Sequence, residues 1–72
     1  MSLMTRLKFE RLRRGWSQVE LADRTKVANS YISKFERRVA LPYDSQARRL
    51  SKALLIPTEQ LLESVDATLT AR

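Results

Sequence analysis

Side chains that can form hydrogen bonds gather between residues 29 and 37, in the sequence NSYISKFER. Apolar residues recur there at Ile32 and Phe35, the i, i+3 spacing of one helix face. We therefore expect a helix whose outward side chains are Asn29, Ser30, Tyr31, Ser33, Lys34 and Arg37. Such a short, polar and basic face, with one aromatic residue, can enter a major groove and form hydrogen bonds with base edges.

The sequence lacks most of the side chains that catalysis usually needs. The 72-residue chain contains no histidine and no cysteine, which removes the usual general base and the usual ligands of zinc. The sequence also has no glycine-rich phosphate loop and no paired acidic site. We expect neither enzymatic activity nor a metal or other cofactor.

Basic residues are concentrated in the first part of the chain. Residues 1–55 hold thirteen of the fourteen lysines and arginines and five of the eight acidic residues, a net charge of +8. Residues 56–72 have a net charge of −2. This local excess predicts a polyanionic partner, which could be DNA, RNA or an anionic membrane surface. No apolar run reaches the roughly 18–20 residues that span a membrane, and residues 1–7 do not resemble a signal peptide. We expect a cytoplasmic, nucleoid-associated protein.

Glycine and proline mark the boundaries of the expected helices. The chain has only Gly15, Pro42 and Pro57, each between apolar-periodic stretches, and no stretch alternates as a half-buried strand does. We expect one all-α domain over residues 1–72, with a core over about 3–64 and an extension or tail over 65–72. Its five helices would cover about residues 3–14, 17–24 and 29–37, with a fourth from near Asp44 and a fifth from near Pro57 or Thr58.

Apolar spacing also predicts the buried face of each helix. Ser17 and Glu20 have the spacing of a capping box at the start of the second helix, and the tight turn over residues 25–28 is typical of a helix-turn-helix. Trp16 and Val27 are expected in the core. The expected inner positions of the first, second and fourth helices are Leu3, Leu7, Leu12, Leu21, Ala22, Thr25, Tyr43, Ala47, Leu50 and Leu54.

This pattern resembles the Xre/Cro-like helix-turn-helix regulators, which include lambdoid phage repressors, over about residues 5–62. The matching residues are Leu7-Lys8-x2-Arg11, Gly15-Trp16-Ser17-Gln18, Glu20-Leu21-Ala22, Val27, Ser30-Tyr31-Ile32-Ser33-Lys34-Phe35-Glu36-Arg37, Pro42 and Leu50-x2-Ala53-Leu54. The resemblance implies a compact five-helix, lambda-repressor-like domain that binds a palindromic operator in double-stranded DNA as a homodimer and regulates transcription. Helices 2 and 3 would form the helix-turn-helix, with helix 3 in the major groove.

The resemblance also implies roles for individual residues. Asn29, Ser30 and Lys34 would contact bases, and Gln18 would bind a phosphate. Arg11 would pair with Glu36 and so join the first helix to the third, although the two could instead be unrelated surface charges. The other side chains expected at the groove edge or a phosphate are Lys26, Tyr31, Arg37, Arg38 and Tyr43.

Alternatives remain open for several of these residues. Arg37 and Arg38 could be a solvated pair, and Tyr31 a simple surface aromatic residue. The basic residues of the fourth helix, Arg48, Arg49 and Lys52, are expected to form a solvated face.

Four positions depart from the family pattern. The family usually has glycine at the positions of Lys26, Arg38 and Leu55, which end helices and often have a left-handed conformation. A residue other than glycine costs about 1–2 kcal/mol there if that conformation is kept. Either this protein accepts the strain or its turns differ. Ala28 stands where the family usually has a capping Ser or Thr. Asn29 could cap the third helix instead, which would withdraw it from base contact.

The end of the chain predicts a dimer interface. Leu61, Val65 and Leu69 have the i, i+4, i+8 spacing of one helical face, longer than a five-helix core requires. Leu3 and Met4 are possible neighbours at this interface. The alternative is a frayed tail, because residues 66–70 include poor helix formers.

An alternative function is a protein-interaction module such as an antitoxin, with DNA binding secondary.

Overall fold

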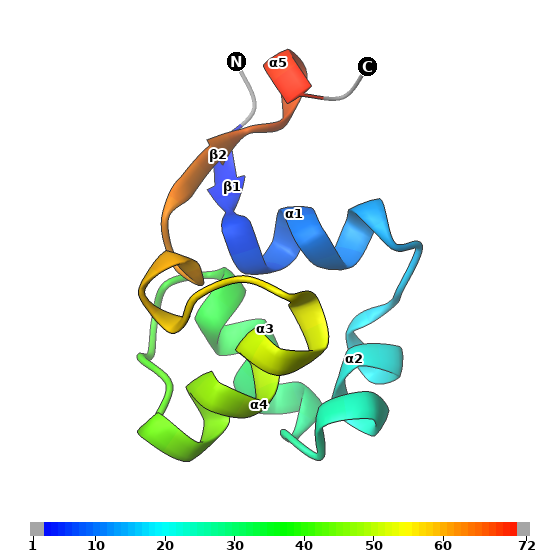
Figure 1. Cartoon of the computed structure of the whole chain (residues 1–72), viewed down its shortest axis with the longest axis vertical. Coiled ribbons are helices and arrows are strands. Elements are labelled where there is room, and N and C mark those ends of the chain that lie inside the picture. The colour runs from blue at the N-terminus through cyan, green and yellow to red at the C-terminus, as the bar shows by residue number, and fades with distance from the viewer. Residues whose placement is uncertain (1–2, 71–72) are drawn as a thin grey trace.

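The computed structural model describes residues 3–70 and shows four helices packed around one apolar core (Figure 1). They are α1 (Arg6–Arg13), α2 (Gln18–Thr25), α3 (Asn29–Glu36) and α4 (Asp44–Leu54). A 3-10 turn, η1 (Thr58–Gln60), follows α4. Two short strands, β1 (Leu3–Thr5) and β2 (Ser64–Asp66), lie at one end of the molecule, and a single helical turn, α5 (Ala67–Thr70), follows β2.

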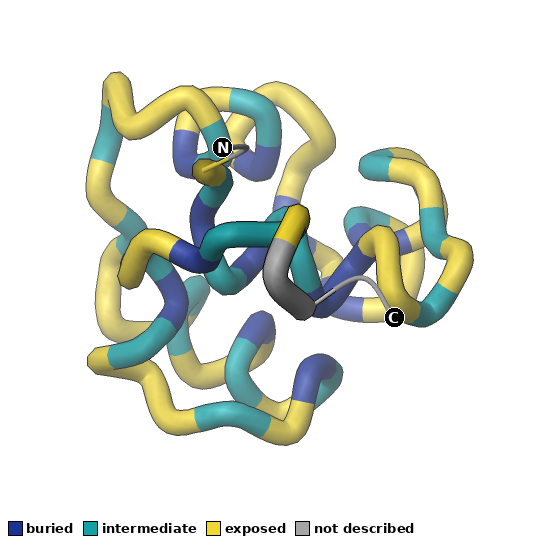
Figure 2. Tube along the Cα trace, turned by 90° about the horizontal axis from the view of Figure 1, so that it is seen from above, coloured by how far each residue is buried: buried dark blue, intermediate teal, exposed yellow. Residues whose placement is uncertain are grey.

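The core takes at least one apolar side chain from every one of the four helices. Buried positions are interspersed among half-buried and exposed ones along the chain (Figure 2). Helices of two to three turns are marginal alone in water, so this shared core, rather than local propensity, holds them in place. Its members are Leu7, Leu21, Val27, Ile32, Phe35, Leu50, Leu54 and Leu61.

Hydroxyl caps begin the first two helices. Thr5 Oγ1 accepts a hydrogen bond from the Lys8 amide at 3.0 Å, and Ser17 Oγ accepts one from the Glu20 amide at 3.0 Å. The third helix begins differently, because its N-cap is Ala28, which makes no side-chain cap. Asn29 is the first residue of the helix, so the alternative in which Asn29 caps α3 is wrong.

Three helix-ending turns contain a left-handed residue that is not glycine. Lys26, Arg38 and Leu55 have φ angles of 60°, 60° and 59°. These are the three positions at which glycine was expected from the family pattern, so the chain keeps the left-handed turn and accepts the cost of a Cβ there.

An antiparallel pair of strands contradicts the expectation of a strand-free fold. Met4 pairs with Val65 at the centre of the β1–β2 ladder. The pairing continues into α1, where the amides of Arg6 and Leu7 donate to the carbonyls of Glu63 and Leu61 at 2.8 and 2.9 Å. Strands of three residues are too short to show alternation, and each depends on a partner about 60 residues away in the sequence.

The fifth helix expected from Pro57 is also wrong. That segment contains η1, β2 and the short α5 instead, so residues 61, 65 and 69 do not form one helical stripe. Leu61 and Val65 are 1% and 6% exposed, which means that both are buried within this chain. The side chain of Leu69 lies outside the described residues.

The inner face of α1 carries charges that apolar periodicity does not reveal. Buried positions there are Leu7, Glu10 and Arg11, whereas Leu12, expected inside, is exposed. The helix begins at Arg6 rather than Leu3, because residues 3–5 belong to β1. The fourth helix begins at Asp44, as expected, and its N-cap is Tyr43. The side chain of Tyr43, expected on the inner face, is exposed.

Candidate nucleic-acid interface

The turn between α2 and α3 is fixed by buried groups. Thr25 Oγ1 donates to the Leu21 carbonyl at 2.8 Å and accepts from the Val27 amide at 3.3 Å. The Val27 side chain is 2% exposed and fills the space beneath the turn, while Ile32 and Phe35 fix the inner face of α3. The outer face of α3 is therefore held on a rigid support.

The outer face of α3 presents exposed polar side chains. Asn29, Ser30, Lys34 and the following Arg37 are exposed, and Ser33 is half-buried. Within residues 3–70, the side chains of Asn29, Ser30 and Arg37 make no hydrogen bond or ion pair. Their donors and acceptors are available to an external ligand.

Tyr31 links this face to the core. Its ring stacks on Phe35 with 6.0 Å between ring centres, and the Lys34 ammonium lies 5.8 Å from the centre of the Tyr31 ring. This cation–π geometry keeps the ammonium of Lys34 on the α3 surface without neutralising its charge.

Glu36 joins three helices at the inner edge of this surface. Arg11 Nε and Nη2 donate to the Glu36 carboxylate at 2.7 and 2.9 Å, and the two side chains are 7% and 4% exposed. Gln18 Nε2 donates to the same carboxylate at 3.0 Å, and Arg11 Nη1 donates to the Trp16 carbonyl at 2.8 Å. The structure thus brings Arg11 and Glu36 together and orients Gln18, at the start of α2.

The remaining groove-edge candidates lie in different settings. Lys26 is exposed, with its Nζ 3.7 Å from Asp23, and Tyr43 is exposed at the start of α4. Arg38 Nη2 donates to the Leu62 carbonyl at 3.3 Å and to Ser64 Oγ at 2.9 Å. The sequence does not predict these hydrogen bonds between the end of α3 and the start of β2, because they join residues 24 to 26 positions apart.

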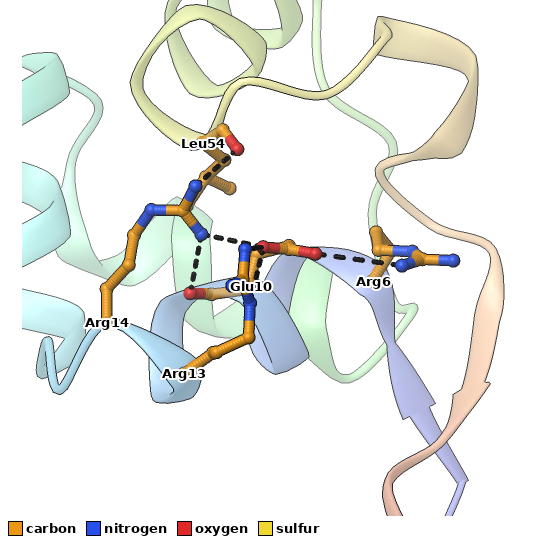
Figure 3. Close-up of polar contacts among 5 residues, drawn as sticks. All are labelled: Arg6, Glu10, Arg13, Arg14 and Leu54. Carbon is orange, nitrogen blue, oxygen red and sulfur yellow. Dashed lines mark hydrogen bonds and ion pairs between the residues drawn. The ribbon is translucent and has the colours of Figure 1, made fainter. Parts of the chain in front are cut away.

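Several arginines contact the carboxylate of Glu10 (Figure 3). Arg13 and Arg14 contact Glu10 Oε1 at 2.6 and 2.7 Å, and Arg6 lies 3.6 Å from Oε2. Burial raises the pKa of Glu10, but hydrogen bonds from Arg13 and Arg14, together with their charges, lower it below its ordinary value. The i, i+3 and i, i+4 spacings could have revealed this cluster in the sequence.

Residues 3–70 contain no group of three or more acidic side chains that could hold a metal ion. In the same described part of the chain, every helix is too short or too polar to cross a membrane.

Comparison with protein families matches residues 7–61 to a model described as helix-turn-helix. The match covers more than half of the chain and includes α1 without its first residue, α2, the turn, α3 and α4. Comparisons with the curated proteins and with the solved structures gave no match.

Proposed function

The chain belongs to the Xre/Cro-like helix-turn-helix family of DNA-binding regulators, and we propose that it is a transcription regulator that binds a palindromic operator as a homodimer. In this proposal α3 lies in the major groove of each half-site and reads its sequence. The family is a regulatory DNA-binding family rather than a family of enzymes.

The exposed polar face of α3 carries this proposal. Asn29, Ser30 and Lys34 extend from a helix that Ile32 and Phe35 hold against the core. Amide, hydroxyl and ammonium groups are suited to the donor and acceptor pattern of base edges in the major groove. We assign base reading to these three residues.

The surrounding polar side chains would hold the protein on the DNA backbone. Contacts with phosphates set register and orientation and supply much of the affinity, but they carry little sequence information. Gln18 is oriented for this role by Glu36, and Tyr31 stands beside Lys34 at the groove edge. We also assign backbone contacts to Lys26, Arg37, Arg38 and Tyr43.

The test begins with DNA selected by the protein from a random pool. Affinity is then measured on the selected duplex and on a scrambled duplex for Asn29→Ala, Lys34→Ala and the control Arg48→Ala, which removes an exposed charge from α4. We expect each α3 variant to lose about 1–3 kcal/mol on the selected duplex and to relax preference at one position. Equal losses on both duplexes would make these residues backbone contacts and not base readers.

Sedimentation of the protein on the selected DNA tests whether it binds as a homodimer. A selected sequence with two inverted half-sites, bound by two chains in sedimentation, supports the proposal. A single half-site bound by one chain at full affinity contradicts it.

A further inference from the structure

A basic pocket lies between α2 and α4. It has a volume of about 440 Å³ and is lined by Trp16, Arg24, Thr25, Arg49, Lys52 and Ala53. We propose that this pocket binds an acidic segment of a partner protein, with an apolar side chain of that segment against Trp16 and its carboxylates on the basic rim.

The floor of the pocket offers an apolar contact. Trp16 is half-buried, and Ala53 beside it packs partly against the core. The guanidinium carbon of Arg24 lies 4.2 Å from the centre of the Trp16 ring. This stacking holds Arg24 over the indole, so the pocket is built before any ligand arrives.

The rim of the pocket carries an excess of positive charge. Arg24 pairs with Glu20 at 3.2 Å, but within residues 3–70 the side chains of Arg49 and Lys52 make no ion pair or hydrogen bond. The lining contains three basic residues and no acidic one. Charge complementarity therefore selects an acidic ligand.

The pocket is separate from the surface assigned to DNA. On α2, Gln18 points toward α3 through its bond to Glu36, whereas Arg24 lies over Trp16 and beside α4. The lining includes no residue of α3. A chain with α3 in a major groove would leave this pocket open to a protein, which is why we favour an acidic protein segment over a second stretch of nucleic acid.

Trp16 is the only tryptophan of the chain, so its fluorescence reports directly on the pocket. The probe is a ten-residue peptide of glutamates around two central leucines, and the matched control peptide has glutamine in place of glutamate. We expect the acidic peptide to change the fluorescence saturably and the glutamine peptide to have no effect. Absence of a saturable change with the acidic peptide overturns the proposal.

Variants then locate the binding site. Arg49→Ala and Lys52→Ala should each weaken peptide binding about fivefold, while Arg48→Ala, a neighbour of equal charge outside the pocket, should change it less than twofold. Equal losses of peptide affinity in all three variants would show that the peptide responds to the net charge of the protein and not to the pocket. A scrambled DNA duplex that gives the same fluorescence change, with the same dependence on Arg49, would make the pocket a second phosphate contact.

Operator affinity is measured on the same proteins. Arg49→Ala and Lys52→Ala should retain it, so a failure of peptide binding and a failure of the proposed DNA reading are distinguishable.

Discussion

Glu36 is the residue at which the framework of the domain meets its outer surface. Its carboxylate accepts from Arg11 of α1 and Gln18 of α2, and it lies one residue before the exposed Arg37. A buried charge is tolerated only when it is paired and hydrogen-bonded. The pair therefore fixes where α3 sits relative to the other two helices.

Breaking this pair should destabilise the fold strongly. Arg11→Met leaves the Glu36 carboxylate buried without its main partner, and we expect a loss of about 3 kcal/mol in the free energy of unfolding. The measurement is a double-mutant cycle of Arg11→Met and Glu36→Gln in urea. Additive losses, with no coupling energy, would show that the two side chains do not interact in solution.

Glu10 should make the stability depend on pH. Its pKa is lowered in the folded protein, so its contribution is present above the ordinary glutamate value of about 4.3 and is lost as pH falls through the folded pKa. Glu10→Gln should cost about 1–2 kcal/mol at pH 7, from the hydrogen bonds to arginine. The difference between the two proteins should shrink when unfolding is measured at pH 3; a constant difference would contradict the assignment.

At the scale of the elements, the turn that ends α4 has a left-handed residue, although that residue is leucine and not glycine. Leu55 has a φ angle of 59° and is 83% exposed, so its side chain contributes little packing to offset the left-handed conformation. Leu55→Gly should raise the free energy of unfolding by about 1 kcal/mol. Leu55→Ala is the control, because it removes the same exposed side chain but retains the Cβ. Equal effects of the two substitutions in thermal unfolding would assign the gain to lost surface and not to the backbone.

The β1–β2 ladder changes the expected consequence of substitutions near the end of the chain. Val65 is buried within the chain, so Val65→Asp should unfold the domain instead of separating two folded subunits. We expect a loss of more than about 2 kcal/mol. The measurement is thermal unfolding with sedimentation at several concentrations, and Ser64→Asp at an exposed position is the control. If the Val65→Asp variant is a folded monomer, Val65 is buried between subunits and not within one chain.

At the scale of the whole molecule, the distribution of charge sets how binding should depend on salt. The first 55 residues carry the net positive charge, yet Arg6, Arg13 and Arg14 already contact Glu10. The Arg37 side chain has no partner within the described part of the chain. Arg37→Ala should weaken binding to all duplexes and lower the slope of log affinity against log salt by about one per subunit. An unchanged slope would remove Arg37 from the backbone contacts, and Arg48→Ala serves as the control for net charge.

The sequence determined those parts of the protein that depend on neighbours in the chain. The spacing of Ile32 and Phe35 placed α3 and its outward face, and Ser17 placed the start of α2, because helix periodicity and caps act within one or two turns. The family pattern indicates where the three turns lie, but it leaves open whether Lys26, Arg38 and Leu55 keep the left-handed conformation, which the structure shows.

Only the tertiary structure decided what the ends of the chain do and how the charges are used. Met4 and Val65 form a strand pair because β1 and β2 meet across the whole length of the chain, and neither has an alternating pattern long enough to detect. Leu61 and Val65 have helical spacing, but burial against this chain overrides it. Arg38 contacts Leu62 and Ser64, the first residue of β2. Basic residues from α2 and α4 line a pocket together with Trp16. These contacts join residues that are far apart in the chain, so no local pattern in the sequence predicts them.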